Sequence, residues 1–197
     1  MYYDQAEVNK GLEKIEEGIE RYPDRLDMRF GKIYALGQVK DWATFTSEVI
    51  RTVQHSATND NQWTWTKNQP KEGGQEAFLH AIQDYQVQLF NTGDTSLLAN
   101  MRSIAREILD IYPEDVPSLS NLSITYLLAE EYEKGLEPLL RAEKIAPEDD
   151  VILSNIAHAY KLNGDKKKAI NYYKKLTKYG SPEMQAFAEE QITELSQ

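Results

Sequence analysis

Apolar residues recur along the chain at intervals of three and four positions, which is the spacing of one face of an α-helix. In residues 182–195, for example, Met184, Ala188 and Leu195 share one face, and Glu190 falls on another. Short polar or proline-containing breaks separate the periodic segments. The pattern therefore predicts ten helices, at residues 6–21, 25–37, 41–54, 75–91, 95–112, 116–129, 132–145, 150–163, 166–178 and 182–195.

The second half of the chain repeats itself with a period of 34 residues, since residues 117–147 match residues 151–181. The identical pairs are Leu119 and Leu153, Ser120 and Ser154, Asn121 and Asn155, Tyr126 and Tyr160, Leu128 and Leu162, and Lys134 and Lys168. Weaker copies precede them, and their closing prolines Pro23 and Pro113 correspond to Pro147. The chain is thus expected to contain several copies of one helical unit.

Small residues stand where the two helices of each unit would approach each other. Ser123 and Ala157 provide them in the first helices, and Gly135 and Ala169 provide them in the second. A proline then ends each second helix, because it has no N–H to donate and clashes with the preceding turn.

Residues that typically begin or end a helix stand at the expected helix boundaries of these repeats. Asp115 and Asp150 stand where an N-cap would begin a first helix. Gly164 stands where a left-handed residue would end one.

The spacing matches the tetratricopeptide pattern W-x2-L-G-x2-Y, then A-x3-F, then P. The last copy reads Leu153-x2-Ile156-Ala157-x2-Tyr160, then Ala169-x3-Tyr173, then Pro182. The chain therefore resembles a tetratricopeptide-repeat (TPR) protein. The resemblance implies an all-α fold, namely a right-handed α-solenoid of antiparallel helix pairs with a C-terminal capping helix.

We expect a single domain over residues 1–197. Its clearest repeats lie at residues 115–180, and residues 181–197 form the capping helix. Residues 56–74 are polar and irregular, and they are expected to form an insertion. The first predicted helix corresponds to the second helix of a pair.

Composition excludes several classes of function. The chain has no cysteine, which rules out disulfides, thiol catalysis and zinc fingers. Its net charge of −10 repels phosphate backbones, so we expect no nucleic-acid partner. The three histidines are scattered, and no phosphate-binding loop or nucleophile motif is present. We therefore expect no enzyme, no cofactor and no bound metal.

No segment of the sequence reaches the ~20 apolar residues that a membrane-spanning helix needs. The first five residues have no basic region followed by an apolar stretch, so no secretion signal is expected within the printed chain. A leader removed beforehand would leave no trace, and the absence of cysteine suits a cytoplasm and a periplasm equally. The compartment therefore stays open between these two.

The resemblance implies that first helices line a concave groove, in which asparagines at the position of Asn121 and Asn155 bond the backbone of an extended peptide. An amide side chain suits this role because it can donate and accept hydrogen bonds. The alternative is that both are ordinary polar residues of a helix surface. The expected groove residues are Asn121, Asn155, Ser120, Ser154 and His158, with Arg29, Lys32 and Asp84 at approximate positions in the weaker repeats. Serines adjoin the asparagines where the family's clamp for a chaperone tail has lysines, so that ligand is not expected.

Two further features could contact a partner. Trp63 and Trp65 lie in the polar insertion, where they either contact a partner or pack back to fill a degenerate repeat. Lys166, Lys167 and Lys168 belong to a basic last repeat, which either steers an acidic partner or forms a solvated face.

The sequence thus predicts a non-enzymatic protein–protein interaction module that holds a peptide or a helix of a partner in its concave groove. The alternative is a self-assembling or complex-assembly subunit, including a homo-oligomer, that docks through its ends or through the Trp63/Trp65 loop.

Overall fold

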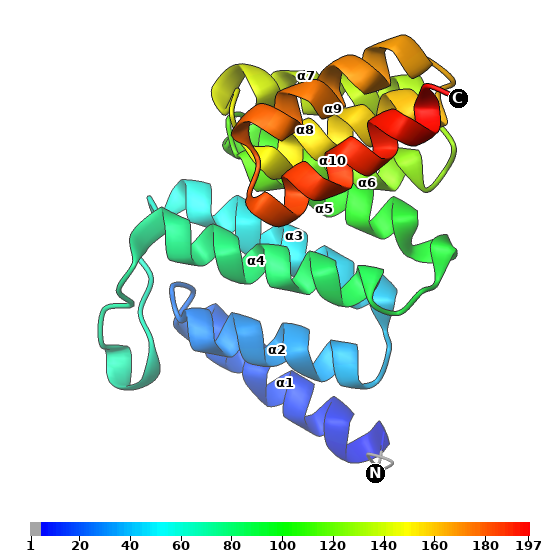
Figure 1. Ribbon diagram of the computed structural model, residues 1–197. Helices are drawn as coiled ribbons and strands as arrows, with labels where there is room; N and C mark the ends of the chain where they lie inside the picture. Colours follow the sequence, from blue (N-terminus) through cyan, green and yellow to red (C-terminus); the bar gives the residue numbers. More distant parts are fainter. Residues whose placement is uncertain (1–4) are drawn as a thin grey trace. The chain divides into compact units, whose positions relative to one another are not determined.

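The computed structural model describes residues 5–197, and side chains from residue 7 onward (Figure 1). That part of the chain contains ten α-helices, two 3-10 turns and no extended strand, so the prediction of an all-α fold built from consecutive helix pairs is confirmed. Residues 1–4, on which the expectation about a secretion signal partly rests, lie outside the described residues. No helix in the described range is long and apolar enough to cross a bilayer.

The chain divides into two compact units, one ending at Ile111 and one beginning at Tyr112. The prediction of one continuous domain stays a prediction. The first unit contains α1 (Gln5–Arg21), α2 (Leu26–Gln38), α3 (Trp42–Thr58), η1 (Thr66–Asn68), α4 (Gly74–Phe90), η2 (Thr95–Leu97) and α5 (Leu98–Ile111). The second contains α6 (Val116–Leu127), α7 (Tyr132–Ile145), α8 (Asp150–Leu162), α9 (Lys166–Tyr179) and α10 (Pro182–Leu195).

Close approach at small residues organises the pairs of the second unit. A Cβ on Gly135 of α7 would lie only 2.7 Å from Leu127 Cδ2 of α6, so nothing larger fits without movement. In the next pair, Ala157 of α8 and Ala169 of α9 are both fully buried. The same Cβ would lie 3.4 Å from the carbonyl oxygen of Ser123, as the repeat pattern predicts, and Ala157 and Ala169 belong to one buried cluster.

Aspartates cap four of the ten α-helices in the described range, namely α3, α6, α8 and α9, because a carboxylate accepts a backbone N–H. Asp115 caps α6 through the N–H of Ser118 at 2.9 Å, as predicted. The prediction for α8 was wrong by one residue, since Asp149 is the cap and Asp150 is the first helical residue. Asp150 instead accepts a hydrogen bond from the backbone N–H of Ser181 at 3.1 Å.

The first helices of three pairs end in the same way, with one residue in the left-handed conformation. Gly164 follows α8 with φ of 80°, as predicted. The backbone N–H groups of Gly164 and the next residue bond the carbonyls of Lys161 and Tyr160, which closes a Schellman motif. Lys40 and Glu130 occupy the same place after α2 and α6 with φ of 59° each, although both have a Cβ. These two positions are strained, because only glycine adopts this conformation without steric cost.

Helix α10 covers the apolar face of the last repeat, as predicted. Ala188 and Leu195 are buried against a cluster that includes Tyr173 of α9. Lys161 of α8 donates to Gln191 and Glu194 at 2.8 and 2.9 Å, which fixes α10 along its polar edge.

We predict that Glu130→Gly stabilises the protein by about 0.5–1 kcal/mol, because it relieves the steric strain of a left-handed residue. This gain exceeds the entropic cost of the more flexible unfolded chain that glycine brings. The reverse change, Gly164→Ala, should destabilise by a similar amount. Urea denaturation measures the stability of both variants, with Glu130→Ala as the control that keeps a Cβ. If Glu130→Gly is less stable than Glu130→Ala, the assignment of strain to Glu130 is contradicted.

Candidate functional site

A groove of about 460 Å³ runs between α6 and α8, the first helices of the two clearest repeats. Its walls contain three of the predicted residues, namely Ser120, Asn121 and Asn155. The rest of the lining is mainly apolar and consists of Val116, Pro117, Ile124, Asp149, Val151 and Ile152. We call this surface the α6–α8 groove.

A hydrogen bond links the two repeats across this groove. Asn155 Nδ2 donates to Ser120 Oγ at 2.9 Å, and Ser120 is 8% exposed. The bond explains why Ser120 is more buried than its repeat partner Ser154, because the side chain of Asn155 covers Ser120. Ser154 is half-buried and, like His158, is absent from the groove lining.

His158 lies further along α8 and is exposed. Partial desolvation and the charge of Lys161 lower the pKa of the His158 imidazole, which keeps it neutral at pH 7. The other three predicted groove residues belong to the first unit.

Lys32 is not open to solvent, contrary to what a groove residue requires. It is 7% exposed and forms ion pairs with Glu16 of α1 and, at 3.1 Å, with Glu48 of α3. A buried charge needs such partners because it has lost its hydration. Lys32 therefore joins three helices of the first unit.

Arg29 and Asp84 have different surroundings. Arg29 is half-buried, and its Nε donates to the carbonyl of Pro23 at 2.8 Å. Burial lowers the pKa of Arg29, and its guanidinium lies 5.9 Å from the ring centre of Trp63. Asp84 is exposed and lies 3.7 Å from Nδ1 of His80, one turn earlier on α4.

The insertion is shorter than predicted, because α3 continues to Thr58 and α4 begins at Gly74. Ser56, inside the predicted insertion, is fully buried and bonds back to the carbonyl of Val53. This bond satisfies the buried hydroxyl group, so Ser56 is accommodated inside the helix. The irregular segment is therefore residues 59–73, which we call the loop.

Both tryptophans of the loop pack back onto the first unit. Trp63 is 3% exposed, with its ring between His55 at 5.4 Å and Phe78 at 5.2 Å. Trp65 is half-buried, edge-on to Phe30 at 6.4 Å. Of the two alternatives, contact with a partner or packing back onto the repeat, Trp63 therefore follows the second, and its ring presents no free surface to a partner.

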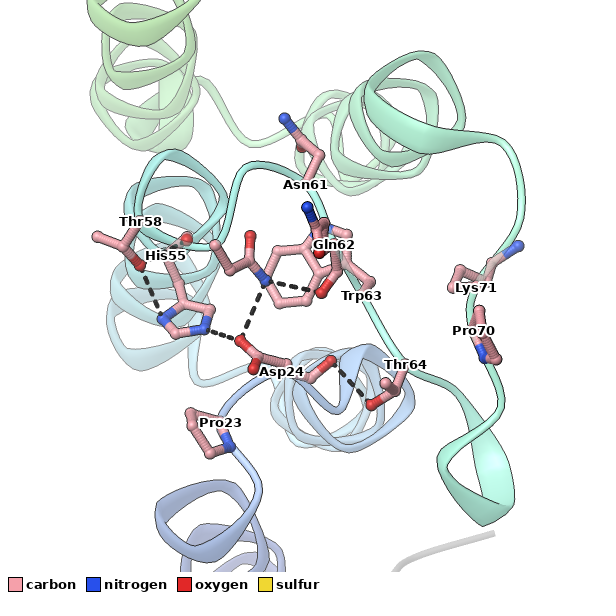
Figure 2. Close-up of a pocket in the computed structure, with 11 residues that line it drawn as sticks. Pro23, Asp24, His55, Thr58, Asn61, Gln62, Trp63, Thr64, Pro70 and Lys71 are labelled. Atoms are coloured by element: carbon pink, nitrogen blue, oxygen red, sulfur yellow. Dashed lines mark hydrogen bonds and ion pairs between the residues drawn. The ribbon is translucent and has the colours of Figure 1, made fainter.

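Beside Trp63 lies an open pocket of about 850 Å³, which we call the loop pocket (Figure 2). Asp24, from the turn between α1 and α2, lies at its centre and accepts from His55 Nε2 at 2.7 Å. Asn59 Nδ2 donates to the same oxygen at 3.2 Å. These bonds, chiefly that from His55, hold the pKa of the Asp24 carboxyl below its ordinary value, so it is ionised at neutral pH.

Backbone contacts hold the loop to this turn. The N–H of Thr64 donates to the carbonyl of Asp24 at 2.9 Å, and the N–H of Leu26 donates to the carbonyl of Thr64 at 3.0 Å. The loop residues Asp60 and Asn61 have φ of 53° and 56°, which is a strained conformation.

The lysines of α9 are paired to different degrees. Lys168 bonds Asp165 at 3.0 Å and lies 5.0 Å from the ring centre of Tyr160. Lys166 and Lys167 are exposed on the same turn. Their role in partner contact stays a prediction.

Within residues 5–197, no group of three or more His, Asp or Glu side chains is arranged to hold a metal ion. Sequence reasoning missed the apolar walls of the α6–α8 groove, although Pro117 and Val151 share a repeat position about one helical turn before Ser120 and Ser154. It also missed Asp24, His55 and Asn59, which come together because the turn before α2 lies against the C-terminal end of α3.

We predict that Asp24 contributes stability that depends on pH. Because its folded pKa is lowered, the contribution is fully present above the ordinary pKa of about 3.9 and is lost as pH falls through the lower folded value. The Asp24→Asn variant should therefore differ most from the wild type at pH 6–7, by up to about 1 kcal/mol, and least at pH values below the lowered folded pKa of Asp24. Urea denaturation at several pH values measures this, with Asp84→Asn as the exposed control; a difference independent of pH would contradict it.

Comparisons with known proteins support the fold. No protein-family model matches the chain, and no curated protein sequence matches it. Among solved structures, residues 41 to the end of MamA from Desulfovibrio magneticus RS-1 align with TM-score 0.51 and 14% identity, covering 85% of this chain and 82% of that one. TTC0263, a thermophilic TPR protein in Thermus thermophilus, aligns with TM-score 0.55 and 12% identity, covering 94% and 91%. The chain therefore has a TPR-like fold.

Proposed function

We propose that the chain is a non-enzymatic protein-interaction module, and that its α6–α8 groove holds an extended peptide segment of a partner protein. The observation that carries the proposal is the placement of Asn121 and Asn155, one per repeat, on the walls of a single, mainly apolar groove. The TPR-like fold is consistent with this role but does not by itself assign it.

The chemistry of the groove suits a peptide. The Asn155 amide is positioned by its bond to Ser120, so little conformational entropy is lost when its oxygen accepts a peptide N–H. Val151 is 53% exposed, and with the half-buried Val116 and Ile124 it offers an apolar surface to an aliphatic side chain. Asp149 at the rim and the net charge of −10 disfavour acidic segments.

We predict that replacing both groove asparagines by alanine weakens peptide binding roughly tenfold or more, since each lost hydrogen bond costs about 0.5–1.5 kcal/mol. The ligands are peptides selected from a displayed random library against the wild type, and fluorescence anisotropy measures their affinity. Asn171→Ala, an exposed asparagine on α9, is the matched control and should bind normally.

Nuclear magnetic resonance locates the bound peptide. Shifts confined to α6 and α8 support the proposal. Equal binding by the double variant, or shifts on another face of the second unit, would overturn it.

Self-assembly is the second candidate, and an apolar surface in the first unit favours it. Tyr34 of α2 is 58% exposed and borders a shallow groove with Val8, Leu12 and Ile15 of α1. If copies associate through this surface, light scattering should show a mass that rises with concentration, and Tyr34→Ser should abolish the rise. A monomeric mass throughout would exclude this candidate.

A further inference from the structure

Gly11 of α1 has the helix-contact position of its repeat, but no helix uses it. It corresponds to Gly135, since each stands twelve residues before its closing proline. At Gly135, a Cβ would lie 2.7 Å from Leu127 and 3.4 Å from the carbonyl oxygen of Ser123, both on the first helix of that pair. At Gly11, no described atom beyond its own stretch of α1 lies within 4 Å of the same point. Glycine inside a helix is less favourable than alanine, so an exposed glycine here is best explained by a close approach from outside.

An apolar groove opens beside this glycine. It has a volume of about 180 Å³ and runs between α1 and α2, with Val8, Leu12 and Ile15 on one wall and Tyr34 on the other. We call it the α1–α2 groove. Tyr34 is 58% exposed. Covering these side chains would remove apolar surface from water, which favours association.

The exposed charges beside the groove are complementary to themselves. Glu7, Gly11 and Lys14 are spaced i, i+4 and i+7, so they share one face of α1, with the glycine between the two charges. If two α1 helices cross antiparallel at Gly11, Lys14 of each lies beside Glu7 of the other. Lys14 bonds Glu17 of its own helix, but those side chains are 74% and 64% exposed, and such a pair is easily exchanged. A surface that carries its own complement is what a two-fold interface requires.

We propose that the α1–α2 groove is the interface between two copies of this chain, in which the α1 helices cross antiparallel at Gly11. Each Tyr34 is then covered by the other copy, and two Lys14–Glu7 ion pairs flank the crossing. This inference rests on self-assembly, the second candidate above, and specifies its partner and its geometry. It involves the first unit alone and is independent of the α6–α8 groove.

The first variant fills the space at the crossing. We expect Gly11→Leu to abolish the dimer that sedimentation equilibrium detects for the wild type, because the two helices can no longer approach. The change leaves the single chain intact, since the space around Gly11 is open and leucine favours a helix. At a concentration where the wild type is monomeric, this variant should therefore unfold at the same temperature or a higher one.

Charge reversal tests the antiparallel geometry. Lys14→Glu should raise the dissociation constant of the dimer about tenfold, because each copy then brings two carboxylates together across the interface. Glu7→Lys combined with Lys14→Glu should restore the wild-type affinity. Lys10→Glu is the matched control, since it makes the same change of net charge on the opposite face of α1 and should leave the affinity nearly unchanged.

The outcomes separate this geometry from self-assembly in general. A monomeric mass of the wild type at every concentration excludes self-assembly, and this interface with it. If Gly11→Leu still dimerises, or if the double reversal fails to restore what Lys14→Glu removes, the crossing of α1 helices is wrong, although self-assembly through another surface survives. None of these results bears on peptide binding by the α6–α8 groove.

Discussion

The distance at which two helix backbones can approach each other decides the architecture of this chain. Where Gly135, Ala157 and Ala169 stand at the contact, the helices of a pair lie close, and the neighbouring large side chains fill the space towards the next helix. Dense packing of this kind is sensitive to a single added methylene. The second unit consequently follows the repeat pattern closely, and its groove is lined by residues at equivalent positions of two repeats.

In the first unit, aromatic rings fill the space between the helices. Phe30, Tyr85, Phe45 and Trp42 form a series of edge-to-face contacts with centroids 5.4–5.9 Å apart, and Trp65 adjoins this series from the loop. Such contacts are favourable and also hold the helices apart. Burial raises the pKa of Tyr85 to about 12. The loop belongs to this arrangement because Trp63 fills the space between His55 and Phe78.

How well the sequence predicts each feature of the structure depends on whether the feature arises from local repeat packing or from contacts between distant residues. Hydrophobic periodicity located every α-helix to within a few residues, and the repeat spacing located the contact of Ser123 with Gly135 as well as Asn121 and Asn155 on one groove. Asp150 was misassigned as a cap because two adjacent aspartates satisfy the same pattern, and only the backbone geometry distinguishes them. Lys32 could not be assigned from its position, since its burial depends on Glu16 and Glu48 from two other helices. The loop pocket likewise joins residues more than thirty positions apart, with no local signal.

The backbone hydrogen bonds within the loop decide where the chain can tolerate an insertion or a protease cut. Trp63 and Lys71 are joined by a backbone hydrogen bond of 2.8 Å, and Trp65 and Gln69 by one of 2.7 Å, so the loop has a closed stem. The tip at Thr66–Asn68 is exposed and beyond these bonds. Extra residues inserted there, or a protease cut, would leave the stem and its buried indole in place. The tip is therefore where additional sequence can be acquired without disturbing the helices beneath it.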